Sequence, residues 1–194
     1  MGHVPRRVDH RERRELLADA LMRLAATRGL EGVSLRHVAA EAGVSTGMVQ
    51  HYFRTKDEMM TFAFGMVMDR VGERSRAAAE PASPRALVRG LLLEILPLDQ
   101  TRRLENHVVL AFLAYAAVKP SIASELREVA ARTRDFLAEQ IRTGGAADPE
   151  RAAAGLLALV DGLGLQLLSR QCEEDDAVAA LDAQLALLFG AEPR

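Results

Sequence analysis

The chain has 194 residues, of which 49% are hydrophobic and only 4% aromatic, and its formal net charge at neutral pH is −2. This length allows one large domain or two small ones, and the small net charge excludes a basic field over the whole protein. The single cysteine, Cys172, excludes an intramolecular disulfide framework. The apolar residues are mainly Ala and Leu, which are strong helix formers. We therefore predict an all-α protein with a sizeable core.

The first three predicted helices lie close together in the sequence. The first covers about residues 9–28, where leucines recur at helical spacing and a glycine follows the last turn. The second begins after Ser34, a good N-cap residue, and ends at "EAGVS", where Gly43 can adopt a left-handed conformation. Ser45 is placed to cap a third helix that continues through Tyr52.

Six further helices are predicted in the rest of the chain. Thr55 and Glu58 have the spacing of a capping box, which opens a fourth helix that ends before "EPASPR". The fifth and sixth cover "RALVRGLLLEIL" and "TRRLENHVVLAFLAYAAV", and the seventh starts after Pro120. The last two begin near Pro149 and in "EEDD", because proline and acidic residues favour a helix N-terminus.

Two helices joined by a tight glycine turn, with another helix before them, form a helix-turn-helix. In that motif the second helix enters the DNA major groove. Gly47 costs this helix about 1 kcal/mol relative to Ala, which is acceptable if the backbone must approach a phosphate. Gln50 can offer a paired donor and acceptor to a base edge, and His51 and Tyr52 can reach bases or phosphates. The alternative is ordinary helix packing without DNA binding.

The stretch "SLRHVAAEAGVSTGMVQHYFRTKDEMM" resembles the DNA-binding signature of the TetR family of bacterial transcriptional regulators. The resemblance covers about a third of the chain, and the helix number and chain length fit the rest. The later part, from "LEILPLDQ" to "LAEQIR", resembles more loosely the regulatory region of BetI-type members. The resemblance implies a nine-helix TetR-type architecture. It places a DNA-binding domain in residues 1–55, with the helix-turn-helix at about 33–52, and an effector-binding and dimerisation domain in residues 56–194.

The resemblance also implies a set of DNA contacts. Lys56 matches the family's phosphate-binding lysine at the start of the fourth helix, and Tyr52 matches a position that contacts the DNA backbone. The chain departs from the family at Thr46, where many members have Lys or Arg, and at Gln50, where many have Tyr, so no operator sequence is implied. The whole expected set is Arg36, Ser45, Thr46, Gly47, Gln50, His51, Tyr52 and Lys56.

An effector pocket is expected where adaptable apolar side chains meet a few polar tips. For each candidate the alternative is plain core, and the candidates are Phe62, Met66, His107, Phe112 and Tyr115. The eighth and ninth helices carry more apolar surface than one core-facing stripe needs, which predicts burial on a second side. The resemblance likewise implies a homodimer through these helices, and the expected interface residues are Leu156, Leu159, Leu163, Leu167, Leu181, Leu185 and Leu188.

The sequence contains no pattern typical of a catalytic triad, a metal site or a dinucleotide-binding loop. We therefore expect no catalytic residue, metal or cofactor. We also expect no membrane segment and a cytoplasmic location, since no apolar run approaches the roughly 20 residues that a membrane helix needs and the N-terminal region lacks a signal-peptide core. The predicted function is a homodimeric repressor that an unknown small-molecule effector releases from a palindromic double-stranded DNA operator. The alternatives are an enzyme on a helical scaffold and a helical adaptor that has lost DNA binding.

Overall fold

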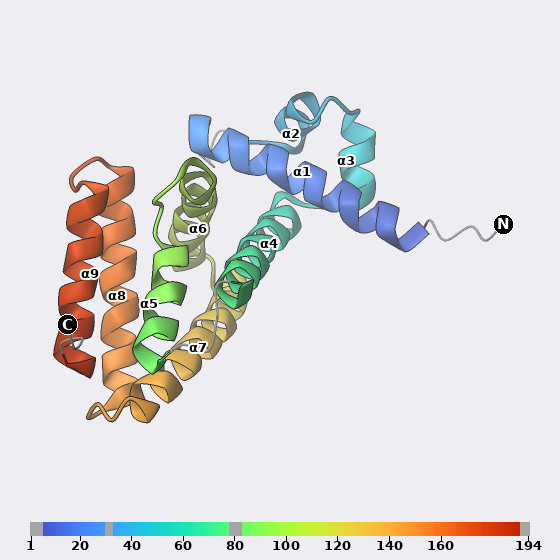
Figure 1. Ribbon diagram of the computed structural model, residues 1–194. Helices are drawn as coiled ribbons and strands as arrows, with labels where there is room; N and C mark the ends of the chain where they lie inside the picture. The colour runs from blue at the N-terminus through green and yellow to red at the C-terminus, as the bar shows by residue number, and fades with distance from the viewer. Residues whose placement is uncertain (1–5, 30–32, 78–82, 191–194) are drawn as a thin grey trace. The chain divides into compact units, whose positions relative to one another are not determined.

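The computed structural model describes residues 6–29, 33–77 and 83–190, and within these residues the chain forms nine helices and no strand (Figure 1). The predicted all-α class is confirmed. In chain order the helices are α1 (Arg6–Arg28), α2 (Leu35–Glu41), α3 (Thr46–Tyr52), α4 (Lys56–Ala77), α5 (Pro84–Ile95), α6 (Gln100–Val118), α7 (Pro120–Thr143), α8 (Pro149–Leu168) and α9 (Glu174–Phe189).

The predicted starts of α2, α3 and α4 are confirmed by hydrogen bonds at the caps. Ser34 Oγ accepts from the backbone N–H of His37, and Ser45 Oγ accepts from that of Met48. Thr55 Oγ1 accepts from the backbone N–H of Glu58, as a capping box requires. The return bond differs from the standard box, because the Glu58 carboxylate accepts from the N–H of Arg54 rather than from that of the cap residue.

By packing, the chain forms two compact units. Unit 1 comprises residues 1–67 and 107–123, and unit 2 comprises residues 68–106 and 124–194. This division differs from the predicted boundary near residue 55, because the first half of α4 and the second half of α6 belong to the same unit as the helix-turn-helix. Phe64 of α4 stacks on Phe112 of α6 within unit 1, with ring centroids 4.3 Å apart.

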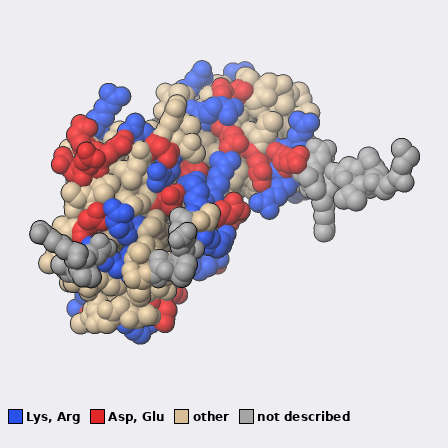
Figure 2. Space-filling model, in the orientation of Figure 1, with Lys and Arg blue, Asp and Glu red and all other residues tan. Residues whose placement is uncertain are grey.

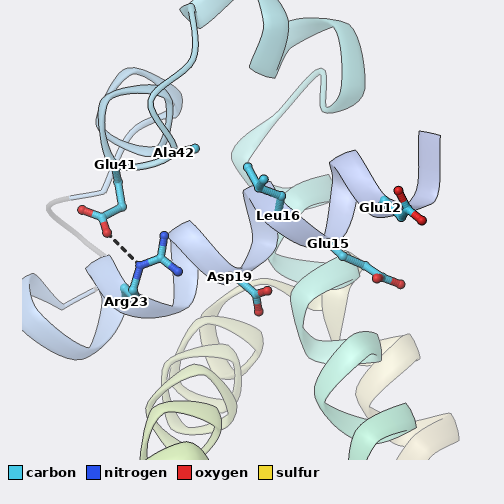
Figure 3. Close-up of a pocket in the computed structure, with 7 residues that line it drawn as sticks. All are labelled: Glu12, Glu15, Leu16, Asp19, Arg23, Glu41 and Ala42. Atoms are coloured by element: carbon cyan, nitrogen blue, oxygen red, sulfur yellow. Dashed lines mark hydrogen bonds and ion pairs between the residues drawn. The ribbon is translucent and has the colours of Figure 1, made fainter. Parts of the chain in front are cut away.

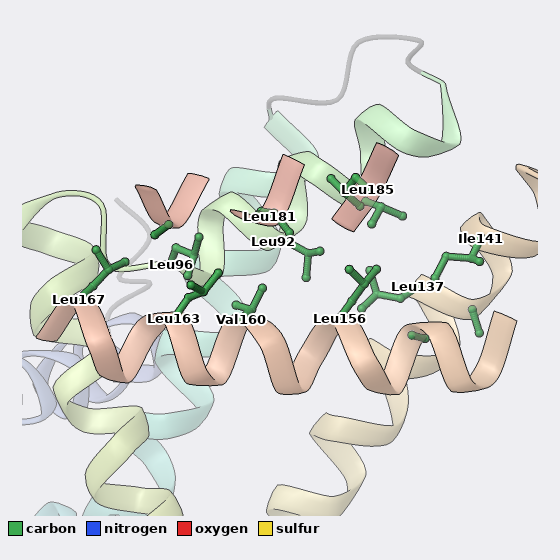
Figure 4. Packing of buried hydrophobic residues seen from close by; sticks show 14 residues of the cluster. Leu92, Leu96, Leu137, Ile141, Leu156, Val160, Leu163, Leu167, Leu181 and Leu185 are labelled. Atoms are coloured by element: carbon green, nitrogen blue, oxygen red, sulfur yellow. The ribbon is translucent and has the colours of Figure 1, made fainter. Parts of the chain in front are cut away.

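The core of unit 2 is a cluster of aliphatic side chains from α5, α7, α8 and α9 (Figure 4). Leu156, Leu163 and Leu167 of α8 point into this cluster, and Leu181 and Leu185 of α9 meet them there. Leu159 and Leu188 are partly buried against it. The leucines that the sequence analysis placed at a dimer interface therefore lie in or against the core of their own subunit.

One described helix, α8, is long and apolar enough to cross a membrane if only length and composition are considered. The sequence analysis did not anticipate such a segment. A single helix of this kind is weak support for a membrane span, since core helices share the same composition. Here one face of α8 lines the aliphatic cluster of unit 2, as a core helix does.

Candidate DNA-binding surface and effector cavity

The helix-turn-helix presents a polar surface on a well-anchored short helix. Gly43 in the turn has a φ of +67°, a conformation that favours glycine. Val49 and Phe53 are completely buried and fix α3 against unit 1. On the other side of α3, the side chains of Gln50 and His51 are exposed together with the Gly47 backbone, and Arg36 of α2 is exposed as well.

Among the residues that the structure describes, Gly47 has no neighbour that would exclude a side chain. A Cβ atom built at this position would meet only Ser45 Oγ, at 3.9 Å. Its backbone is not in the left-handed region either, so the fold alone gives no reason for glycine. This observation favours a reason outside the chain, such as the close approach of a DNA phosphate.

Replacing Gly47 with Ala should therefore change stability and DNA binding in opposite directions. Helix propensity predicts a gain of up to about 1 kcal/mol in the free energy of unfolding, whereas the added methyl group should weaken operator binding. Urea denaturation and fluorescence anisotropy with labelled operator DNA measure the two effects. Unchanged operator affinity would remove the close-approach explanation for this glycine.

Three further residues, Met48, Tyr52 and Arg54, lie on or just after α3. Tyr52 is half-buried, and its ring contacts those of His10 and His51 at centroid distances of 4.9 and 5.0 Å. Met48 and Arg54 are exposed on α3 and directly after it, although the sequence analysis did not select them. A methionine can contact a thymine methyl group and an arginine a phosphate. The sequence could have indicated both residues, because they lie between Ser45 and Lys56, which were expected to contact DNA.

An arginine joins α1, α3 and α4 inside unit 1. The Arg14 guanidinium lies 4.5 Å from the ring centroids of both Phe53 and Phe62, and it donates a hydrogen bond to Glu58. The two rings also contact each other, with centroids 5.5 Å apart. Phe62, which the sequence analysis placed in an effector pocket, thus packs against Phe53 at the end of α3.

A second polar cluster holds the first turn of α4 in unit 1. The Asp57 carboxylate accepts hydrogen bonds from the Tyr115 hydroxyl, at 2.7 Å, and from the Lys119 ammonium group. Lys119 also donates to the Tyr115 hydroxyl. The hydrogen bonds from Lys119 and Tyr115 hold the pKa of Asp57 below its usual value. Lys56, the expected phosphate contact, directly precedes Asp57 in the first turn of α4. By anchoring Asp57, this cluster therefore helps to position Lys56.

Removing the cluster should weaken operator binding modestly. We expect Lys119→Met and Asp57→Asn each to lower operator affinity about two- to fivefold, the range of a solvent-exposed ion pair. The double variant should lose no more than either single variant, because both remove the same interaction. Anisotropy titrations of the three proteins measure this. Additive losses would mean that the two residues act independently.

A groove on the α1 and α2 side of unit 1 is acidic. It is lined by Leu16 and by Glu12, Glu15, Asp19 and Glu41, with Arg23 bonded to Glu41 at 2.8 Å (Figure 3). Arg11, in the basic first part of the chain, is bonded to Glu15. Basic and acidic side chains are also interspersed on the face seen in Figure 2. The groove and this face therefore offer no broad basic surface to DNA, and attraction there would come from local contacts.

The remaining expected effector residues lie in unit 1. Phe112 is completely buried in its stack with Phe64, and Met66 is also buried. His107 is half-buried, and burial lowers its pKa. Tyr115 belongs to the cluster around Asp57. The structure therefore brings the five expected residues onto α4 and α6 of one unit but distributes them among separate contacts.

A cavity in unit 2, open to solvent on one side, is large enough for a small molecule. Its volume is about 580 Å³, within the range of small-molecule sites. The second half of α4, α5 and α7 line it, with mostly apolar side chains, and the residues are Met68, Asp69, Val71, Gly72, Ser75, Arg76, Leu91, Ile95, Val129, Arg132, Thr133 and Phe136. Sequence reasoning selected neighbouring positions on α4 but missed this set.

The outer face of α8 and α9 is apolar and built mainly from small residues. Leu165 is 50% exposed and Leu187 is 80% exposed. The other exposed residues of α8 and α9 are the small residues Ala154, Gly155, Ala158, Gly162, Ala179, Ala180 and Ala183 and, mainly toward the helix ends, the polar residues Glu150, Arg151, Asp161, Gln166, Asp175 and Asp176. The small residues lie opposite the leucines that enter the core, so the two helices have a second apolar side.

Comparisons with known proteins match both parts of the chain. A family model for bacterial regulatory proteins of the tetR family matches residues 17–61, and a model for the C-terminal part of BetI-type transcriptional repressors matches residues 84–190. The HTH-type transcriptional regulator PksA of Bacillus subtilis (strain 168) is 36% identical over 85% of this chain and 83% of its own length. These matches are to transcriptional regulators and not to enzymes.

Solved structures agree with the sequence matches. A transcriptional regulator from Rhodococcus sp. Rha1 has a TM-score of 0.86 and 37% identity, covering 93% of this chain and 99% of its own. A transcriptional regulator from Saccharomonospora viridis, determined in complex with choline, has a TM-score of 0.78 and 26% identity, covering 90% and 94% of the two chains.

Proposed function

Because this chain belongs to the TetR family of DNA-binding transcriptional regulators, we propose that it is a cytoplasmic homodimeric repressor that a small molecule releases from a palindromic operator. The observation that carries this proposal is the exposed polar side of α3, on a helix whose other side is fixed by the buried Val49 and Phe53. We propose that Arg36, Gly47, Gln50, His51 and Lys56 contact the operator, together with Ser45, Thr46 and Tyr52.

The outer face of α8 and α9 supports the proposed dimerisation. An exposed apolar face of this kind marks an interaction surface, and the glycines and alanines permit close helix approach. We propose a four-helix interface built from this face, with Leu165 and Leu187 at its larger contacts, in place of the leucines that fill the subunit's own core. Two subunits related by a two-fold axis would then read two half-sites about 34–36 Å apart.

The cavity of unit 2 supplies the effector site in this proposal. It is lined by the second half of α4, while Lys56 lies in the first turn of the same continuous helix. A ligand that displaces this helix therefore changes the position of the DNA contacts. The ligand must bind the released state more tightly than the operator-bound state, since equal affinity shifts nothing. The choline complex of the similar Saccharomonospora viridis protein supports a small-molecule effector.

Two substitutions separate affinity from sequence preference. Lys56→Ala should weaken binding to all DNA sequences about equally, because it removes one phosphate contact. The slope of log K against the logarithm of the salt concentration should become shallower by about one unit. Gln50→Ala should instead relax the preference at one base position, by about 1–3 kcal/mol. Anisotropy titrations over a salt series, with operator and scrambled DNA, test the first expectation. For Gln50, a DNA selection that returned the parent consensus would refute its role as a base reader.

A further inference from the structure

The cavity of unit 2 has an apolar side and a basic side. Val71 of α4, Leu91 and Ile95 of α5, and Val129 and Phe136 of α7 provide apolar surface. Ser75 and Arg76 of α4 and Arg132 of α7 provide polar surface. A molecule that fills this cavity therefore meets both hydrocarbon and guanidinium groups.

The two guanidinium groups are unmatched. Within the part of the chain that the structure describes, neither Arg76 nor Arg132 has a hydrogen-bond or ion-pair partner. Other arginines of unit 2 that pack against neighbouring helices are matched, as Arg74 is by Glu105 and Arg89 is by Asp182. Both side chains are exposed to solvent, so their positive charge is available to a molecule bound in the cavity.

The net charge of the lining favours an anion. Asp69 is the one carboxylate among the lining residues that the structure describes, so the two arginines leave an excess of one positive charge. Arginine binds carboxylates and phosphates through paired hydrogen bonds. A quaternary ammonium group would instead need the faces of several aromatic rings, and Phe136 is the single aromatic side chain in the described lining.

We propose that the effector of this protein is an amphiphilic organic anion. Its carboxylate or phosphate group binds Arg76 and Arg132, and its hydrocarbon part lies against Val71, Leu91 and Val129. This inference rests on the proposed effector site and adds the chemical class of its ligand. The proposed ligand class differs from choline, which is bound in the structure of the similar Saccharomonospora viridis protein.

Four ligands with the same hydrocarbon chain and different headgroups test the proposal. Octanoate, octyl phosphate, octanol and octyltrimethylammonium are titrated into the full-length protein, without DNA, by isothermal titration calorimetry. We expect at least one anion to bind about tenfold or more tightly than octanol, because charged hydrogen bonds add to the shared apolar contacts. We expect the ammonium compound to bind most weakly. The two anionic arms distinguish a carboxylate from a phosphate headgroup.

Matched variants locate the binding. Arg132→Gln and Arg76→Gln should each weaken binding of the preferred anion about tenfold or more, with octanol affinity unchanged. Arg134→Gln, an exposed arginine outside the cavity lining, should leave both affinities unchanged. Thermal unfolding without ligand checks that the variants remain folded.

Several results would overturn the proposal. These are tighter binding of octyltrimethylammonium than of either anion, equal affinities for all four compounds, absence of binding by all four, or anion binding that both cavity variants retain. Operator binding by the ligand-free protein is measured separately. A protein that binds its operator but fails these titrations would lose the proposed ligand class and keep its proposed role as a DNA-binding regulator.

Discussion

Replacing Leu187 with Glu is expected to convert the protein into folded monomers that no longer hold the operator. Leu187 is 80% exposed on α9, so the isolated subunit tolerates a charge there. In the proposed dimer the same charge would be buried without a partner, once in each subunit. Operator affinity should fall about a hundredfold or more, because two linked half-site contacts become independent.

Sedimentation velocity and operator titration measure the two consequences of this substitution. Val118→Glu is the matched control, because Val118 is 79% exposed and lies on α6, outside the proposed interface. The control should remain a dimer with parental operator affinity. A Leu187→Glu protein that sediments as a dimer and binds DNA normally would show that subunits associate through another surface.

Replacing Arg74 with Met is expected to lower the free energy of unfolding by about 2–4 kcal/mol. This loss is smaller than the loss expected on breaking a fully buried ion pair, because the Arg74 side chain is partly exposed. Arg74 donates to both carboxylate oxygens of Glu105, at 3.1 and 2.8 Å, and to Glu94 at 2.6 Å. Glu105 is only 3% exposed. After the substitution, Arg70, at 4.0 Å, would be the remaining ion-pair partner of Glu105 among the residues that the structure describes.

A second variant separates the lost ion pair from lost packing. Arg74→Met combined with Glu105→Leu should recover much of the stability, because replacing both partners of a buried pair by apolar groups is often neutral. Arg151→Met, which removes an exposed pair with Asp148, should have little effect on stability. Urea denaturation compares the four proteins. A double variant that is less stable than Arg74→Met alone would mean that Glu105 is stabilised by other groups.

Local chemistry made the helix boundaries predictable. Ser34, Ser45 and Thr55 cap the expected helices because their side-chain oxygens accept backbone N–H bonds within three residues. The conformation of Gly43 follows from the same short stretch of sequence. The motif around α3 contained enough spacing information to identify the DNA-binding surface, although Met48 and Arg54 were overlooked there.

Long-range packing could not be read in the same way. The apolar residues of α8 form two sides, and helical spacing does not tell which side faces the subunit's own core. The structure places the larger side chains, such as Leu156 and Leu163, inside and leaves Ala158 and Gly162 outside. The effector candidates raised the same difficulty, since Phe62 and Tyr115 have partners from helices distant in the sequence.

A selection of DNA from a random double-stranded library, with the purified full-length protein, tests the central claim most directly. Two symmetric subunits, each inserting α3 into the major groove, predict a palindromic consensus whose half-site centres lie about one helical turn, or 10–10.5 base pairs, apart or slightly more. A library that shows no enriched sequence, or only a single unrepeated half-site, would contradict a dimeric sequence-specific regulator.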